Sequence, residues 1–261
     1  MQDASIYAVA AALLGLIVGS FLNALSFRFN TGKSIMHGRS QCMRCGHTLH
    51  ALDLIPLLSY LLLGGKCRYC GTKISLQYPA VEAAGALLSF GVYMITPALL
   101  PFIFWFIVWM VLLFIVVYDL RHTIIPWSCS FLLLFLSIIS LFAFHTPTLS
   151  MLLAGPALAL PLVLLSLFSG GTWMGWGDGA LELSLGWLFG LVPGLTALTL
   201  GIWSGAIVGV LLVLYSQLRT RKSKVGFTMK SELPFAPFLV LGGVLIYFFH
   251  VDLFSSIISL W

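Results

Sequence analysis

The sequence predicts an all-helical membrane protein with about eight transmembrane helices and a small zinc-ribbon-like cytoplasmic domain between the first two. Of its 261 residues, 60% are hydrophobic and only 8% are charged, whereas soluble domains average roughly 45–50% apolar and 25% charged residues. Apolar stretches near or above the roughly 20 residues that a helix needs to cross a bilayer recur along the chain. Composition, this recurrence and the placement of the basic residues all favour the same fold class.

Eight apolar segments are expected to span the membrane: residues 5–27, 80–96, 101–118, 126–144, 149–168, 180–194, 196–215 and 234–251. The first has no charged n-region and no cleavage site, and polar Asn23 lies near its end. We therefore expect a retained helix rather than a removed signal peptide. The sixth segment is short and contains glycine and proline.

The basic residues test this count of spans. If the N-terminus lies outside, four loops fall on the inner side: 28–79, 119–125, 169–179 and 216–233. These loops hold all 13 Lys and Arg residues, and the outer loops hold none. An eight-span topology with both ends outside therefore satisfies the positive-inside rule. The net charge of +5 is then explained by the basic residues of the inner loops, and we expect no nucleic-acid binding.

Four cysteines in the first inner loop have the spacing of a metal site. Cys42 and Cys45 form one Cys-x-x-Cys pair, Cys67 and Cys70 form the other, and a glycine follows each pair. Four thiolates suit tetrahedral Zn²⁺, and the spacing is close to that of a zinc ribbon. Two disulfides or four incidental thiols are the alternatives, but a cytoplasmic loop lies in a reducing compartment. We expect a structural zinc, because four protein ligands leave no open position for a substrate.

Other residues of this region are given plainer roles. Cys129 lies in an apolar segment and is interpreted as a packing residue. His37, His47 and His50 are expected to face solvent, since four cysteines already complete a zinc site. The apolar stretch at 53–65 is too short to span a bilayer, and we expect it to pack on the membrane surface or against the cysteine knuckles.

Two aspartates are expected at the inner ends of spans. Asp119 lies in "FIVVYDLRHTIIP" and Asp178 in "MGWGDGALEL". Simpler roles exist for both: Asp178 suits the N-cap of a helix, and Asp119 suits an interfacial position balanced by Arg121. Glu182, one helical turn beyond Asp178, is the rival partner for Asp178.

Ionisable residues at membrane depth are costly and usually functional, so we interpret the two aspartates as a catalytic pair. Two adjacent carboxylates do not both ionise easily, so one acts as a base towards water while the other donates a proton or hydrogen bond to a carbonyl. Gly175, Gly177 and Gly179 are expected to allow an extended or unwound backbone beside Asp178, where a substrate strand would lie.

These residues carry a resemblance to a known family. "VYD" with "GWGD" resembles the Gly-x-Gly-Asp intramembrane aspartyl proteases, and the whole chain more narrowly resembles the type IV prepilin peptidases. The resemblance runs almost end to end, through the tetracysteine loop and through "GSFLNALSFR" (19–28), "LDLIPLLSYL" (52–61), "ISLQYPAVE" (74–82), "DLRHTIIP" (119–126), "GWGD" (175–178) and "LPFAPFLVLGG" (233–243).

The resemblance implies a bifunctional enzyme of the bacterial inner membrane, with an active site that faces the cytoplasm and both termini in the periplasm. Such enzymes cut the basic leader from type IV prepilins or type II secretion pseudopilins, then N-methylate the new N-terminus with S-adenosylmethionine. By resemblance the catalytic residues are Asp119 and Asp178, and the zinc ligands are Cys42, Cys45, Cys67 and Cys70. The expected regions are 1–27 as the first span, 28–79 as the tetracysteine domain and 80–261 as the peptidase core.

This chain departs from the family pattern at four positions. Ala180 replaces a usual lysine, Trp127 a common aspartate, Met43 a common proline and Ala236 a usual glycine. Two other classes are alternatives: an ion- or proton-coupled transporter and a non-enzymatic assembly scaffold. A transporter usually places its acidic residues near the midplane within paired halves, and no internal repeat is found here. A scaffold leaves the two aspartates unexplained.

Overall fold

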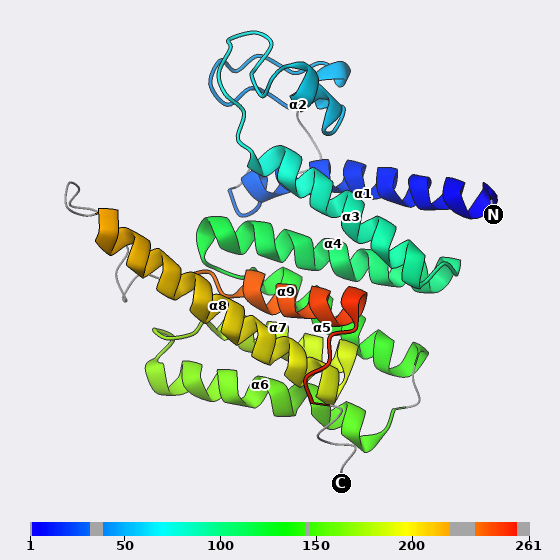
Figure 1. The fold of residues 1–261 in the computed structure, drawn as a ribbon, viewed down its shortest axis with the longest axis vertical. Helices are drawn as coiled ribbons and strands as arrows, with labels where there is room; N and C mark the ends of the chain where they lie inside the picture. The colour runs from blue at the N-terminus through cyan, green and yellow to red at the C-terminus, as the bar shows by residue number, and fades with distance from the viewer. Residues whose placement is uncertain (1, 32–38, 145–146, 220–232, 255–261) are drawn as a thin grey trace. The chain divides into compact units, whose positions relative to one another are not determined.

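The computed structural model describes residues 2–31, 39–144, 147–219 and 233–254 (Figure 1). The elements are α1 (Gln2–Arg28), the 3-10 helix η1 (Ala51–Leu54), α2 (Leu58–Leu62), α3 (Gln77–Ile95), α4 (Leu99–His122), α5 (Trp127–Ala143), α6 (Leu149–Ser169), α7 (Trp176–Phe189), α8 (Leu191–Arg219) and α9 (Ala236–Phe249). Within those ranges the β-structure consists of two isolated bridges, Gln41 with Thr48 and Lys66 with Lys73. The predicted helical class is therefore confirmed.

In the part of the chain that the structure describes, five helices are long and apolar enough to cross a membrane, namely α1, α3, α4, α6 and α8. The apolar helices α5 and α9 are shorter, with 17 and 14 residues, and α7 also has 14. A helix that crosses the hydrocarbon core alone needs roughly 20 residues. The chain is a multi-pass membrane protein, and the number of eight spans stays a prediction.

The sixth expected span, 180–194, is placed differently by the structure. Helix α7 begins at Trp176 and ends at Phe189, and α8 begins at Leu191. Gly190 separates them with φ 85°, a conformation that glycine adopts without strain. Pro193 then falls in the first turn of α8, where a helix tolerates proline. The predicted span 180–194 therefore combined most of α7 with the first residues of α8.

The chain divides into two compact units, Met1–Val117 and Tyr118–Trp261, and α4 continues through the boundary. In the first unit α1 packs closely on α3. A Cβ atom on Gly19 would lie 2.9 Å from the carbonyl oxygen of Val81, so glycine is what allows these two backbones to approach. The hydroxyl of Ser89 adds an interhelical hydrogen bond of 2.6 Å to the carbonyl of Ala11.

Polar and aromatic contacts join the end of α1 to the start of α3. The side-chain amide of buried Asn23 donates to the carbonyl of Tyr78 at 3.0 Å. The rings of Phe27 and Tyr78 stack with centroids 5.5 Å apart. The two ends of the tetracysteine loop are therefore held together where the loop leaves and re-enters the helix pair.

The second unit is built around α7, which packs against α5 and α6, while α9 packs on α8. Helices α6 and α7 nearly touch, because a Cβ on Gly186 would lie 2.8 Å from the Cα of Gly155. The indole N–H of Trp187 donates to the carbonyl of Leu152 at 3.0 Å beside this contact. This close packing against α6 fixes the position of α7, which carries Asp178 in its first turn.

Candidate metal centre and candidate active site

The two Cys-x-x-Cys segments fold into equivalent knuckles. In the first, the backbone N–H of Cys42 donates to His47 at 3.0 Å and that of Gly46 donates to Cys42 at 2.9 Å. In the second, the N–H of Cys67 donates to Thr72 at 2.8 Å and that of Gly71 donates to Cys67 at 2.9 Å. Gly46 and Gly71 have φ of 69° and 68°, the left-handed conformation that turns the chain back.

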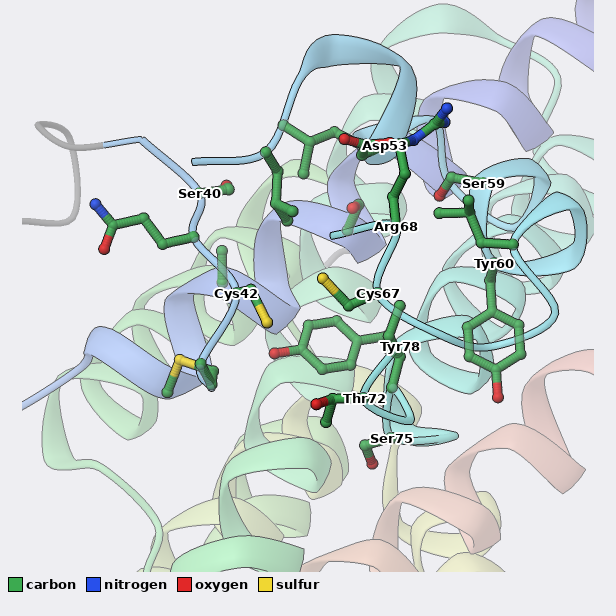
Figure 2. Close-up of a pocket in the computed structure, with 18 of the residues that line it drawn as sticks. Ser40, Cys42, Asp53, Ser59, Tyr60, Cys67, Arg68, Thr72, Ser75 and Tyr78 are labelled. Atoms are coloured by element: carbon green, nitrogen blue, oxygen red, sulfur yellow. Dashed lines mark hydrogen bonds and ion pairs between the residues drawn. The ribbon is translucent and has the colours of Figure 1, made fainter. Parts of the chain in front are cut away.

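The knuckles bring all four predicted thiols together. The sulfur atoms of Cys42, Cys45, Cys67 and Cys70 lie within 4.8 Å of one another, and Cys42 and Cys70 are 3.8 Å apart. Figure 2 shows the sulfurs of Cys42 and Cys67 near each other beside the ring of Tyr78. Four thiol ligands from two knuckles at such distances are able to hold a metal ion.

The knuckle backbone also shifts the thiol pKa values. Backbone hydrogen bonds from Cys45 and Arg44 lower the pKa of Cys42. Hydrogen bonding with the side chain and backbone of Thr72 lowers the pKa of Cys70 to about 6. A backbone hydrogen bond from His47 lowers the pKa of Cys45, but burial and the neighbouring thiols outweigh it and raise the value to about 11. Two of the four sulfurs are thus favoured as thiolates, the form that binds metal.

The histidines lie outside this sulfur cluster. His47 and His50 are exposed as expected, and the ring of His47 packs on Tyr69 with centroids 3.7 Å apart. His37 lies outside the described residues. The apolar stretch that follows forms η1 and α2, with Leu61 and Leu62 about three-quarters exposed at 74% and 77%.

Asp119 is buried at the C-terminal end of α4, with 4% of its surface exposed. Its Oδ2 atom accepts a hydrogen bond of 3.1 Å from the backbone N–H of Ala236, the first residue of α9. The carboxylate therefore lies at a helix N-terminus, where the backbone dipoles favour negative charge. Since this contact uses only backbone atoms of Ala236, it does not depend on the glycine that is usual there.

Asp178 is the third residue of α7 and is also buried. Its Oδ2 accepts from the backbone N–H of Gly175 at 3.1 Å, and its own N–H donates to the carbonyl of Gly175 at 3.2 Å. Gly175, rather than Asp178, is the N-cap of the helix. The prediction that Asp178 helps to cap this helix was therefore right, but its position as the N-cap residue was wrong. The hydrogen bond with Gly175 occupies one of the two carboxylate oxygens of Asp178.

The expected unwinding around Asp178 is limited to Gly175, which has an extended backbone with ψ 148°. Gly177 and Gly179 are helical, so the expectation was wrong for them. A Cβ on Gly177 would lie 2.8 Å from Cβ of Ile125, and one on Gly179 would lie 2.7 Å from Cγ2 of Val163. These two glycines allow close packing of α7 against Ile125 and against Val163 of α6 instead of opening the backbone.

The structure brings Asp119 and Asp178 close enough for the charge of Asp119 to act on Asp178. Glu182, the rival partner, is fully buried, and neither of its carboxylate oxygens has a hydrogen-bond partner in the described part of the chain. Asp119 on α4 therefore remains the candidate partner of Asp178.

Sequence reasoning missed two contributors to these sites. One is the backbone N–H of Ala236, and the only sequence signal for it was the "LPFAP" segment at 233–237. The other is Glu82, on α3. Glu82 is buried and accepts a hydrogen bond of 2.8 Å from the N–H of Leu57. Leu57 has φ 59°, a strained conformation for leucine that an anchoring contact must hold.

The fold and these two sites define a class: a multi-pass helical membrane protein with a four-cysteine cluster able to hold a metal ion and two buried aspartates in the same unit. A family model for the bacterial peptidase A24 N-terminal domain matches residues 13–96. A prepilin leader peptidase/N-methyltransferase of Bacillus subtilis is 32% identical over 255 residues, which cover 95% of this chain and 96% of the relative. This chain belongs to the prepilin leader peptidase/N-methyltransferase family.

Two further relatives carry the same name. That of Pseudomonas aeruginosa is 33% identical over 273 residues, covering 91% of this chain and 88% of the relative. That of Myxococcus xanthus is 38% identical over 164 residues, covering 60% of this chain and 42% of that longer relative. No solved structure matches the chain.

Proposed function

We propose that this chain cleaves the basic leader from type IV prepilins or type II secretion pseudopilins, with Asp119 and Asp178 as the catalytic residues. The relatives' name supports the reaction. The observation that carries the assignment of residues is the electrostatic interaction between two buried carboxyl groups, each at a helix N-terminus.

The geometry suits hydrolysis by a carboxyl pair. One carboxylate takes a proton from a water molecule, whose oxygen bonds to the scissile carbonyl carbon. The other carboxyl, still protonated, donates a hydrogen bond to the carbonyl oxygen. When the tetrahedral intermediate collapses, the carbon–nitrogen bond breaks and the leaving nitrogen takes a proton to become the new N-terminal amine. The backbone N–H groups of Ala236 and Gly175 orient the two carboxyl groups throughout.

The test is cleavage of a purified prepilin by the detergent-solubilised full chain. Asp119→Asn and Asp178→Asn should each lower kcat by at least about 10³-fold, as expected when members of a catalytic unit are removed. Asp252→Asn, at an exposed aspartate, is the matched control and should cleave normally. If either folded variant keeps full activity, that aspartate only caps a helix, and Glu182 becomes the next candidate.

We further propose that the four cysteines hold a structural Zn²⁺. A tetrahedral site with zinc–sulfur bonds of about 2.3 Å has sulfur–sulfur edges of about 3.8 Å, the separation of Cys42 and Cys70. All four ligands come from the protein, so a bound zinc keeps no position open for chemistry. The module spanning the two knuckles, residues 39–76, would then draw much of its folding free energy from the metal.

The second half of the relatives' name implies methylation, and we propose S-adenosylmethionine as the methyl donor. When bound, it supplies an electrophilic methyl group on a positively charged sulfur. The acceptor is the amine that the peptidase step releases, and the chain's part is to hold donor and amine together and to accept the proton that the amine loses.

The eight-span topology with both termini in the periplasm completes the proposal. It puts Asp119, Asp178 and the tetracysteine loop on the cytoplasmic side of the bacterial inner membrane. The absence of Lys and Arg from every outer loop supports it. The proposed regions remain 1–27, 28–79 and 80–261, with the prepilin and the lipid bilayer as partners.

A further inference from the structure

A cavity of about 470 Å³ lies within the Met1–Val117 unit, away from the aspartate pair in sequence (Figure 2). It is enclosed by the two cysteine knuckles, by the segment from η1 to α2, and by the end of α1 and the start of α3. Its volume falls within the range of small-molecule sites, and a mainly apolar wall with a few polar groups is their usual composition. The cleavage mechanism uses none of its residues.

The cavity has one acidic group that is free to bind a ligand. Of its two acids, Asp53 is taken up by the protein: its oxygens accept from the side chain of Arg68 at 2.7 Å, from the N–H of His50 and from the hydroxyl of Tyr69. Glu82 accepts a single hydrogen bond, from Leu57, among the described residues. Its other carboxylate oxygen is therefore accessible at the cavity wall, where a cation would stabilise it.

An aromatic wall stands next to this acid in the sequence. Tyr78, one helical turn before Glu82 on α3, stacks on Phe27 with an angle of 11° between the rings, and both line the cavity. Tyr60 lines it as well, and Figure 2 draws Tyr60 and Tyr78 among the lining residues. Aromatic faces bind planar heterocycles by stacking and attract organic cations.

Two basic residues supply the opposite charge. Arg44 and Lys73 line the cavity, both are exposed, and neither forms an ion pair with any acid in the described ranges. They lie on different knuckles, so metal binding by the cysteines would fix both of their backbones. A ligand that fits this cavity would combine a planar aromatic ring, a cationic centre and a carboxylate.

We infer that this cavity binds S-adenosylmethionine, with Glu82 facing its cationic centre, the aromatic wall against its adenine ring, and Arg44 and Lys73 at its carboxylate. The inference rests on the proposed methyltransferase function and adds to it the location of the donor. It also links the metal to the second activity, because Cys42 and Cys67 form part of the same wall. A metal-free module would lose the shape of the donor site.

The charge balance argues against the two other candidate occupants. A leader peptide rich in Lys and Arg would meet a cavity with four basic residues, Arg28, Arg44, Arg68 and Lys73, against two acids. An anionic lipid headgroup would suit the basic residues but would bring a phosphate close to the buried carboxylate of Glu82. S-adenosylmethionine has two positive centres and one carboxylate, so it offers a cation to Glu82 and, unlike a basic leader, an anion to the basic residues of the cavity.

The experiment is equilibrium binding of radiolabelled S-adenosylmethionine to the full chain in detergent, with zinc content measured on the same samples. Glu82→Gln removes the charge but keeps an amide oxygen to accept the Leu57 N–H, so the fold is retained. It should weaken binding at least tenfold. Lys73→Gln, at an exposed position, should weaken binding severalfold, and Asp252→Asn, an acid-to-amide change elsewhere, should leave it unchanged.

Three results would overturn the inference. The first is wild-type protein that cleaves prepilin but binds no donor, which leaves the peptidase function standing. The second is donor binding that is unchanged in Glu82→Gln and Lys73→Gln with normal zinc content, which places the donor elsewhere. The third is displacement of the donor by inorganic phosphate or phosphatidylglycerol vesicles with no effect of Glu82→Gln, which makes the cavity an anion site. Failure of cleavage with normal donor binding would instead overturn the peptidase proposal alone.

Discussion

The module at residues 39–76 and the helices of the Tyr118–Trp261 unit solve the problem of stability in opposite ways. In the module, Met43, Leu61 and Leu62 are each at least 74% exposed, and its regular structure is limited to two short helices and two isolated bridges. In the helical unit, backbones touch at glycines, and carboxyl groups are buried. We propose that the module depends on its four cysteine sulfurs, whereas the helical unit depends on glycines, whose lack of a side chain lets the backbones touch.

This contrast explains where each kind of chemistry is placed. Thiolates that share a metal can organise a loop too small to build a core of its own. A pair of carboxyl groups needs rigid elements, because the two must be held at one separation while water enters between them. Closely packed helices provide that rigidity at Asp119 and Asp178.

The largest effect that separates the two regions should come from Cys67→Ser, at the buried cysteine of the cluster. Loss of one of four ligands should remove most of the metal affinity, which in structural zinc sites is worth about 10–16 kcal/mol. Bound zinc should fall to background, and protease should cut the module while the helices stay intact. Cys129→Ser, at the cysteine outside the cluster, should change neither. A zinc content that survives Cys67→Ser would contradict the four-ligand site.

A smaller effect is expected where α6 and α7 touch. Gly186→Ala puts a Cβ 2.8 Å from the Cα of Gly155, and backbone cannot yield as a side chain can. We expect a loss of about 1–3 kcal/mol of stability, seen as a lower melting temperature with unchanged zinc content. Gly209→Ala is the control, because its Cβ would meet only the tip of Leu233 at 3.2 Å. An equal loss in both variants would mean that close packing is not what these glycines provide.

Glu182 tests the helical unit in the opposite direction. Its carboxyl group is buried without a hydrogen-bond partner among the described residues, which is costly. Glu182→Leu, of similar volume, should raise the free energy of unfolding by about 1–3 kcal/mol and leave prepilin cleavage intact. If the stable variant stops cleaving, Glu182 belongs to the active site.

The smallest effect concerns pH and the module. Burial raises the pKa of Asp53, but hydrogen bonds from Arg68 and His50 outweigh it and hold the pKa below the usual value. The stabilisation is therefore present above the unfolded pKa of about 3.9 and is lost as pH falls through the lower folded value. Since the Arg68 side chain is 51% exposed, Asp53→Asn should cost under about 1 kcal/mol at pH 7. Protease resistance of the module should differ between the two proteins at pH 7 and converge in acid.

The sequence was sufficient to predict the features that depend on apolar runs and on residue spacing. Apolar runs located the helices, the Cys-x-x-Cys spacing located the metal cluster with its two left-handed glycines, and the basic loops led to Asp119 and Asp178. Three features escaped it. The role of Gly177 and Gly179 was misjudged because a missing Cβ serves an unwound strand and a tight helix contact equally well. The bond from Ala236 to Asp119 and the bond from Leu57 to Glu82 join backbone atoms to distant side chains, which composition does not record.

The central claim is that Asp119 and Asp178 work as one unit, and a double-variant cycle on prepilin cleavage tests it most directly. Purified Asp119→Asn, Asp178→Asn and the double variant, each with normal zinc content and melting behaviour, would be compared with the wild type in one assay. The account predicts that each single variant loses about as much activity as the double variant, because half of a carboxyl pair does no hydrolysis. Losses in the single variants that multiply to give the loss in the double variant would show two independent residues and contradict the pair.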